Sequence, residues 1–62
     1  LDIEQAVDRL PEEIKETAIL FFFQELKQKE IADLLNIKLS LVKYRVSVAK
    51  KLLSKQLEVD IK

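Results

Sequence analysis

The sequence predicts an all-α fold, a four-helix domain that contains a helix-turn-helix. Hydrophobic residues recur at spacings of three and four along most of the chain, which is the period of amphipathic helices. The chain has no glycine and one proline, too few for the turns of a small β-barrel. Hydrophobic residues make up 48% of its 62 residues, which is too high a share for a disordered chain.

The first two predicted helices meet at Pro11. Asp2 is expected to cap the first helix by accepting a hydrogen bond from the amide three residues later. Pro11 is expected to end that helix, because a proline disfavours α geometry in the residue before it, here Leu10. Pro11 is expected at the first position of the second helix, where its missing N–H costs nothing. The second helix is expected to run to about Gln24, with hydrophobic residues on two sides.

A short third helix is predicted over residues 28–35. Ile31, Leu34 and Leu35 are expected to face inward, because they follow the helical period. Asn36 is expected to end this helix, because asparagine tolerates the left-handed conformation better than most residues with a side chain.

A long fourth helix is predicted from about residue 39 to residue 57. Its buried stripe follows the spacing i, i+4, i+7, i+11. The stripe consists of Val42, Val46, Ala49 and Leu53. Residues 58–62 continue no periodic pattern and are expected to fray. The sequence therefore predicts one domain over residues 1–57 and a frayed C-terminal tail over residues 58–62.

The charged residues are segregated along the chain although they sum to zero. Residues 1–37 contain four basic and nine acidic side chains, a net charge of 4 − 9 = −5. Residues 38–57 contain six basic and no acidic side chains, a net charge of +6, and the tail adds −1. A basic stretch of this length indicates a polyanionic partner, most commonly a nucleic acid.

Several classes of function are disfavoured by what the sequence lacks. Without cysteine or histidine, the chain has no thiolate or imidazole for a zinc site and lacks the commonest general base. The longest apolar run, residues 18–23, is much shorter than the roughly 20 residues of a membrane span. The carboxylates of Glu12, Glu13 and Glu16 are expected on an exposed helical turn with no pocket around them, which does not suit catalytic carboxylates. We therefore expect no enzyme activity, cofactor, metal or membrane insertion, and we expect one domain of an intracellular protein.

The third and fourth helices have the features of a helix-turn-helix. Ala32 is small where the two helices must cross closely, and Ile37 is an apolar residue in the turn. Val42 and Val46 determine which face of the last helix points away from the core. That outward face would lie in the major groove of a DNA duplex.

The ordered set of motifs resembles the C-terminal promoter-recognition domain, region 4, of bacterial sigma factors, and in particular the extracytoplasmic-function group. The resemblance covers about residues 6–57. It is carried by Leu10-Pro11-Glu12-Glu13, Leu20, Phe22-Phe23, Leu26, Glu30-Ile31-Ala32, Leu35, Ile37, Val42-Lys43, Arg45, Ala49 and Leu53.

This resemblance implies a cytoplasmic transcription-initiation domain that binds the upstream, minus-thirty-five promoter element. Such a domain acts within RNA polymerase, also contacts the flap of the β subunit and is commonly covered by an anti-sigma factor. The resemblance implies no catalytic residue.

The resemblance also implies a set of site residues. Lys43 and Arg45 match the family's VKxR motif, and Arg45 lies near enough to the buried stripe to tie the helix to the domain instead. Lys27 and Lys38 lie at the starts of the two motif helices, where phosphates bind. The expected DNA-binding residues are Lys27, Lys38, Ser40, Leu41, Lys43, Tyr44, Arg45 and Ser47. The expected partner-binding residues are Phe21 and Phe22.

The chain departs from the family's pattern at several positions. Lys27 and Lys38 replace capping serines, and neither side chain can accept a hydrogen bond. Leu41 replaces a threonine and Val48 replaces an arginine in the last helix. Glu25 replaces a glycine that ends the second helix, so this helix is expected to end differently here.

Two other readings of the sequence stay open at this point. The output domain of a response-regulator-type transcription factor shares the four-helix plan. A helical protein-interaction module without DNA binding would instead present its basic helix to an acidic partner.

Overall fold

The computed structural model describes residues 2–57, with the backbone alone at Leu57. It confirms an all-α domain with four α-helices, and the described residues contain no strand. The predicted tail, residues 58–62, lies outside the described residues. The elements are α1 (Ile3–Asp8), α2 (Glu12–Ala18), a π-helix η1 (Ile19–Phe23) that continues α2, α3 (Gln28–Leu35) and α4 (Leu39–Leu57).

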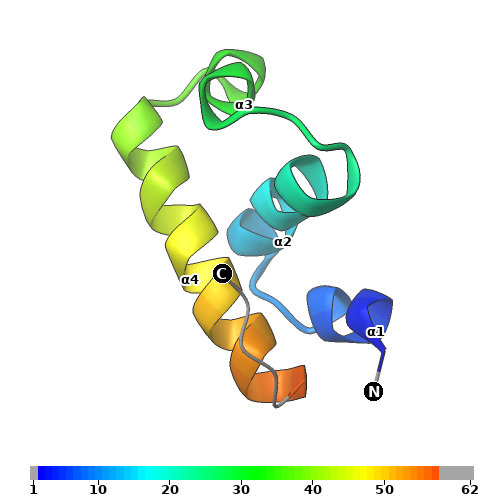
Figure 1. Cartoon of the computed structure of the whole chain (residues 1–62). Helices are drawn as coiled ribbons and strands as arrows, with labels where there is room; N and C mark the ends of the chain where they lie inside the picture. The colour runs from blue at the N-terminus through cyan, green and yellow to red at the C-terminus, as the bar shows by residue number, and fades with distance from the viewer. Residues whose placement is uncertain (1, 58–62) are drawn as a thin grey trace.

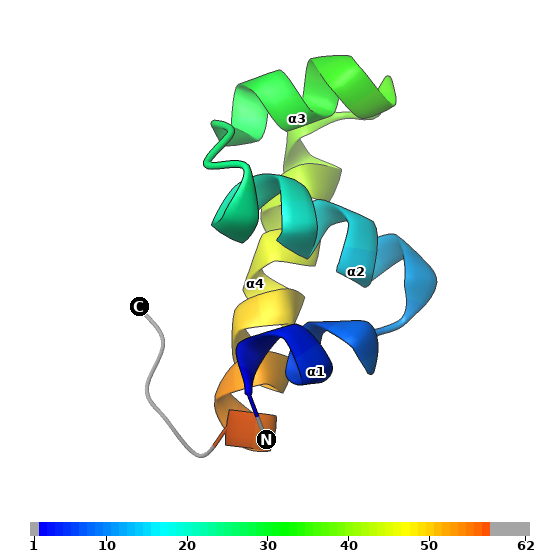
Figure 2. The same cartoon turned by 90° about the vertical axis from the view of Figure 1, so that its right-hand side faces the viewer.

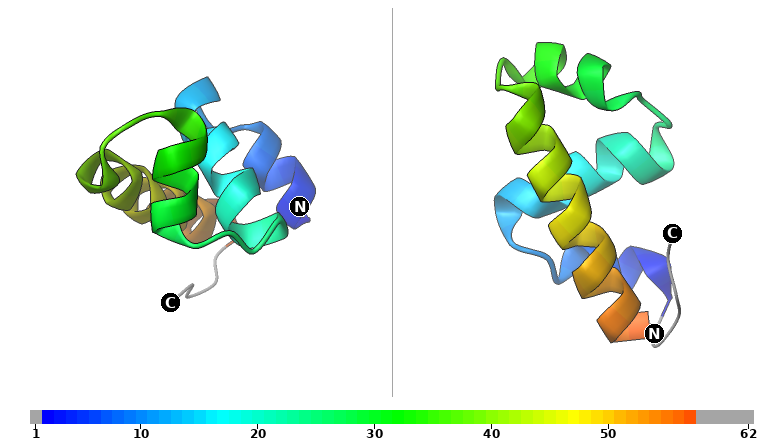
Figure 3. Two further views of the ribbon diagram at one scale, coloured as in Figure 1. Left: turned by 90° about the horizontal axis from the view of Figure 1, so that it is seen from above. Right: turned by 60° about the vertical axis from the view of Figure 1, so that its left-hand side comes forward.

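The long helix α4 forms one side of the molecule, and the other helices pack along it (Figure 1). Helix α3 lies across the N-terminal end of α4, α2 crosses its middle, and α1 lies beside its C-terminal half (Figures 2 and 3). Among residues 2–57, no element packs on the face of α4 that is turned away from these three helices.

The cap predicted for α1 is confirmed, whereas Pro11 lies one residue before α2 and not at its first position. The Gln5 amide donates to the Asp2 carboxylate at 2.9 Å, which satisfies one free donor of the first turn. Pro11 has an extended ψ of 147° and precedes α2 instead of forming its first turn. Its carbonyl oxygen accepts from the Lys15 amide at 2.8 Å, so α2 still begins directly after the proline.

An exposed ion pair connects α1 to α2. The Lys15 Nζ lies 2.7 Å from the Asp8 Oδ1. The hydrogen bond and charge of Lys15 lower the pKa of Asp8, and those of Asp8 raise the pKa of Lys15. The contribution of Asp8 to stability is therefore lost as the pH falls through its lowered pKa, and that of Lys15 is lost as the pH rises through its raised pKa.

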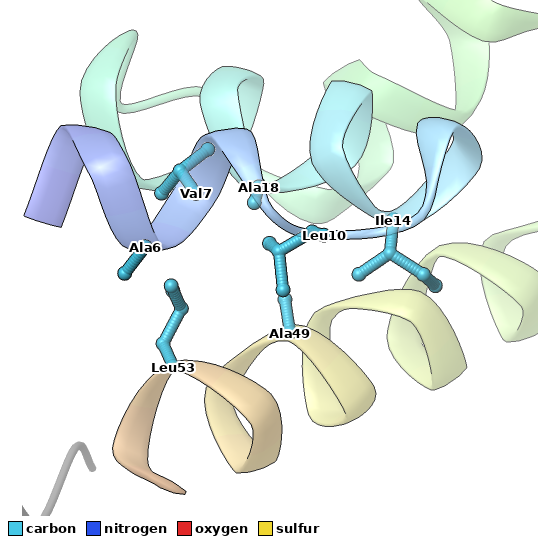
Figure 4. Close-up of a cluster of buried hydrophobic side chains, with 7 residues drawn as sticks. All are labelled: Ala6, Val7, Leu10, Ile14, Ala18, Ala49 and Leu53. Atoms are coloured by element: carbon cyan, nitrogen blue, oxygen red, sulfur yellow. The ribbon is translucent and has the colours of Figure 1, made fainter. Parts of the chain in front are cut away.

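The first of two hydrophobic clusters fills the space between α1, α2 and the C-terminal half of α4 (Figure 4). The loop between α1 and α2 contributes Leu10, which points toward Ala49 of α4 (Figure 4). The small residues in this cluster let the three helices approach closely. Its buried members are Ala6, Val7, Leu10, Ile14, Ala18, Ala49 and Leu53.

The second cluster lies under the crossing of α3 and α4. Ile31 and Val42 are fully buried in it, and Ala32 and Val46 are almost so. Ile37, in the turn, packs against them as predicted. Its amide donates to the Ala32 carbonyl at 3.0 Å, while Asn36 takes the predicted left-handed conformation at φ 55° and ψ 49°. This C-terminal capping motif lets α4 begin after a three-residue turn.

Between the two clusters, α2 widens into the π-helix η1. The Gln24 amide donates to the Ile19 carbonyl five residues earlier, and the Leu26 amide donates to the Leu20 carbonyl six residues earlier. Glu25 between them has a φ of 57°. The second helix therefore ends in a π-helical turn, as the loss of glycine led us to expect, but Glu25 still takes the left-handed conformation that a glycine would take there.

The prediction that Leu34 faces the core is wrong. Leu34 is 62% exposed, whereas Ile31 is fully buried and Leu35 is half-buried. Successive residues of an α-helix are about 100° apart, so a face centred on Leu35 includes Ile31 and Ala32 but leaves Leu34 outside. The small, buried Ala32 shifts the inward face of α3 to the side away from Leu34.

Glu25→Gly is expected to raise the free energy of unfolding by about 0.5–1 kcal/mol. Relief of the left-handed strain, about 1–2 kcal/mol, exceeds the added backbone entropy of a glycine. The preceding exposed residue, Gln24, has φ −89° and serves as the matched control. Gln24→Gly should lower stability by about 0.5–1 kcal/mol in the same urea titrations. A destabilised Glu25→Gly variant would contradict the left-handed assignment.

Ile31→Ala and Leu34→Ala are expected to differ sharply although both remove a branched side chain from α3. Ile31→Ala should cost about 2–5 kcal/mol, because it opens a cavity in the second cluster. Leu34→Ala should change stability by no more than about 0.5 kcal/mol, because its side chain is exposed. Thermal and urea unfolding followed by far-UV circular dichroism compare the two, and equal losses would refute the orientation of α3.

Candidate nucleic-acid interface

The candidate site is the surface of α4 that faces away from both hydrophobic clusters. We call its first two and a half turns the outer face of α4, defined by Ser40, Leu41, Lys43, Tyr44 and Ser47. All five side chains are exposed. The buried Val42 and Val46 fix this orientation, because residues that flank a clamped residue on a helix must point sideways or outward. The structure therefore brings together the five outer-face residues that the sequence predicted as DNA-binding.

Lys38 marks the start of α4 at one end of the outer face. Its carbonyl oxygen accepts from the amides of Leu41 and Val42 at 3.0 and 3.2 Å. Its exposed ammonium group offers no acceptor to the first amides of the helix. An anion such as a phosphate would satisfy these donors and would also offset the positive end of the helix dipole.

Lys27 precedes α3 and is likewise exposed. The lost serine cap is replaced in part by Glu30, whose carboxylate accepts from the Lys27 amide at 2.8 Å. This contact gives Glu30 a structural role at the start of α3. The side chain of Lys27 remains available to a phosphate near the start of α3.

Arg45 lies apart from the outer face. Its side chain is only 16% exposed, and its guanidinium lies 3.5 Å from the Glu13 Oε2 on α2. Of the two roles that the sequence left open, the structure shows the tie between α4 and the domain. The sequence analysis missed Glu13 as the partner, since nothing in the spacing of two residues 32 positions apart connects them.

The aromatic side chains of η1 lie mostly against the core. Phe22 packs on the first cluster and Phe21 on the second, with their rings 5.0 Å apart in an edge-to-face arrangement. The Lys50 Nζ lies 5.7 Å from the Phe21 ring, within range of a cation–π interaction. Phe23, 44% exposed, presents more surface to a partner than either predicted residue.

No pocket is found, and among residues 2–57 no three acidic, histidine or cysteine side chains cluster as metal ligands would. None of the helices over these residues is long and apolar enough to cross a bilayer. The surface instead presents an exposed, basic helix with hydroxyl and apolar side chains between its lysines, a shape that fits the major groove of a nucleic-acid duplex.

The Glu13–Arg45 pair is expected to contribute little through its charges. Because Glu13 is 77% exposed, the coupling energy should be less than about 1 kcal/mol. A double-mutant cycle with Glu13→Gln and Arg45→Met measures it, and methionine keeps an unbranched stem in the half-buried position. A coupling energy well above 1 kcal/mol would mean that the pair is shielded from solvent.

Comparison with protein families matches residues 1–53 to the family described as sigma-70, region 4. No curated protein and no solved structure matches the chain. The match spans α1, α2, η1, α3 and most of α4, and so includes the whole helix-turn-helix. This is a DNA-binding domain family, not an enzyme family. Because this match covers most of the chain, including the buried stripe of its basic last helix, the chain belongs to the region 4 family of sigma-70 factors.

Proposed function

We propose that this domain recognises the upstream, minus-thirty-five promoter element as part of a sigma factor of the extracytoplasmic-function type. The outer face of α4 would enter the major groove, and Lys27 and Lys38 would bind phosphates on either side. One observation carries the proposal: the basic stretch of residues 38–57, which contains no carboxylate, forms a single helix from residue 39 onward, and the polar side of this helix is exposed.

Within this proposal the site residues have different roles. Lys43 would bind a phosphate or the edge of a guanine, because a lysine is a mobile point charge with three donors. Ser40 and Ser47 can donate to base edges or phosphates. Arg45, already paired with Glu13, would hold α4 in place and would contact DNA only by leaving that carboxylate.

The remaining proposals concern partners and location. The domain would act in the cytoplasm within RNA polymerase, where it would contact the flap of the β subunit. An anti-sigma factor would cover it when transcription is off. The η1 aromatics Phe21 and Phe22 are proposed as the centre of a partner surface, to which the more exposed Phe23 adds area.

Binding of a mixed-sequence DNA duplex is expected to weaken steeply with salt. The logarithm of the binding constant should fall with log salt at a slope of about −0.9 per phosphate neutralised. Lys43→Ala should make that slope shallower by about one unit. Fluorescence anisotropy titrations at several salt concentrations measure both quantities.

Lys55→Ala is the matched control, since Lys55 is an exposed lysine near the far end of the same helix. It should change the slope by less than half as much as Lys43→Ala does. Equal effects of the two substitutions would mean diffuse attraction and would remove Lys43 from the interface. No binding to any duplex at low salt would favour an acidic protein as the partner of α4.

A further inference from the structure

The outer face of α4 has few of the side chains that most often read bases. Arginine and lysine read guanine, asparagine and glutamine read adenine, and acidic residues read cytosine. Residues 39–57 contain no asparagine and no acidic residue, and their one glutamine, Gln56, lies in the last turn. Their one arginine is paired with Glu13. Polar readout at the start of the helix is therefore left to Lys43 and three hydroxyl groups.

Apolar side chains are exposed at the same place. Leu41 is 36% exposed and Tyr44 is 63% exposed, and neither packs into the two hydrophobic clusters. The two residues are three positions apart, so their side chains are neighbours on the surface of the helix. Leu39 is also partly exposed, but it lies only about 60° around the helix from the buried Val42 and so beside the clamped stripe.

An exposed leucine beside an exposed tyrosine offers apolar surface whose burial against a partner is favourable. In the major groove, the apolar group on a base edge is the C5-methyl of thymine. Two exposed lysines near the pair, Lys38 and Lys43, would bring the helix to the phosphates that line this groove.

We propose that Leu41 and Tyr44 form an apolar pair that reads thymine C5-methyl groups, so that the element this domain binds has thymine opposite the first two turns of α4. The inference rests on the proposed function and adds the chemistry of its specificity. The side chain of Leu41 has no hydrogen-bonding group, so it can contact a base edge only by apolar packing.

Replacing thymine by uracil tests the pair, because it removes only the methyl group and leaves every hydrogen-bonding group in place. Duplexes that bind the 62-residue chain are first selected at low salt from a randomised pool. Each thymine of the selected duplex is then replaced by uracil in turn. At one or two positions the replacement should weaken binding about fourfold, the factor expected from burying one methyl-sized group.

Leu41→Ala and Tyr44→Ala should bind the thymine duplex several-fold more weakly and should no longer distinguish it from the uracil duplex. Leu34→Ala is the matched control, since it removes an equally apolar, exposed side chain from α3. It should keep the full discrimination. Circular dichroism of each variant shows that the helices are intact.

The two hypotheses fail in different ways. If no duplex is selected, the proposed function itself is lost. If duplexes bind but uracil is tolerated at every position, or the alanine variants still discriminate against uracil, the methyl-reading pair is wrong and the DNA-binding function stands.

Discussion

Burial of one stripe of α4 against two separate hydrophobic clusters is the constraint on which the structure depends. Val42 and Val46 close the cluster under α3, and Ala49 and Leu53 close the cluster between α1 and α2. Neither cluster is large, as expected for a domain that can bury only about 60% of its unfolded surface. Because a single 19-residue helix serves both, the two halves of the core are held in fixed register, and the outer face of that helix points away from both.

The π-helical turn η1 is where the chain passes from one cluster to the other. Ile19 and Phe22 pack on the first cluster, whereas Leu20 and Phe21 pack on the second. A wider turn changes the angle between successive side chains, which lets neighbouring residues serve opposite sides of the core. The left-handed Glu25 then turns the chain back toward α3. The position of the helix-turn-helix relative to α2 therefore depends on this short, strained segment.

Most of the fold could be predicted from the sequence, because helical periodicity and capping residues are local signals. The bounds of α3 and α4, the turn at Asn36 and the buried stripe of α4 follow directly from them. The π-helical turn could not, since Ile19–Phe23 is apolar at every position and carries no period. Leu34 was misplaced because two faces of α3 are apolar, and only packing against α4 selects between them.

The candidate site was predictable to a similar degree. The outer face of α4 follows from where Val42 and Val46 point, which the sequence predicts. The inward tie of Arg45 depends on Glu13 in a distant helix, and the core packing of Phe21 and Phe22 depends on η1. Contacts of this kind arise only when separate helices meet, and no local pattern encodes them.

Because both hydrophobic clusters include residues of α4, a ligand bound to this helix also stabilises the folded domain as a whole. A duplex bound to the outer face requires α4 to be helical and clamped, so it binds the folded chain and not the unfolded one. At a free concentration one hundred times its Kd, such a ligand adds about 2.7 kcal/mol to the free energy of unfolding. For so small a core this is a large increment, so under the proposed function DNA binding would also make the domain more resistant to heat and proteolysis.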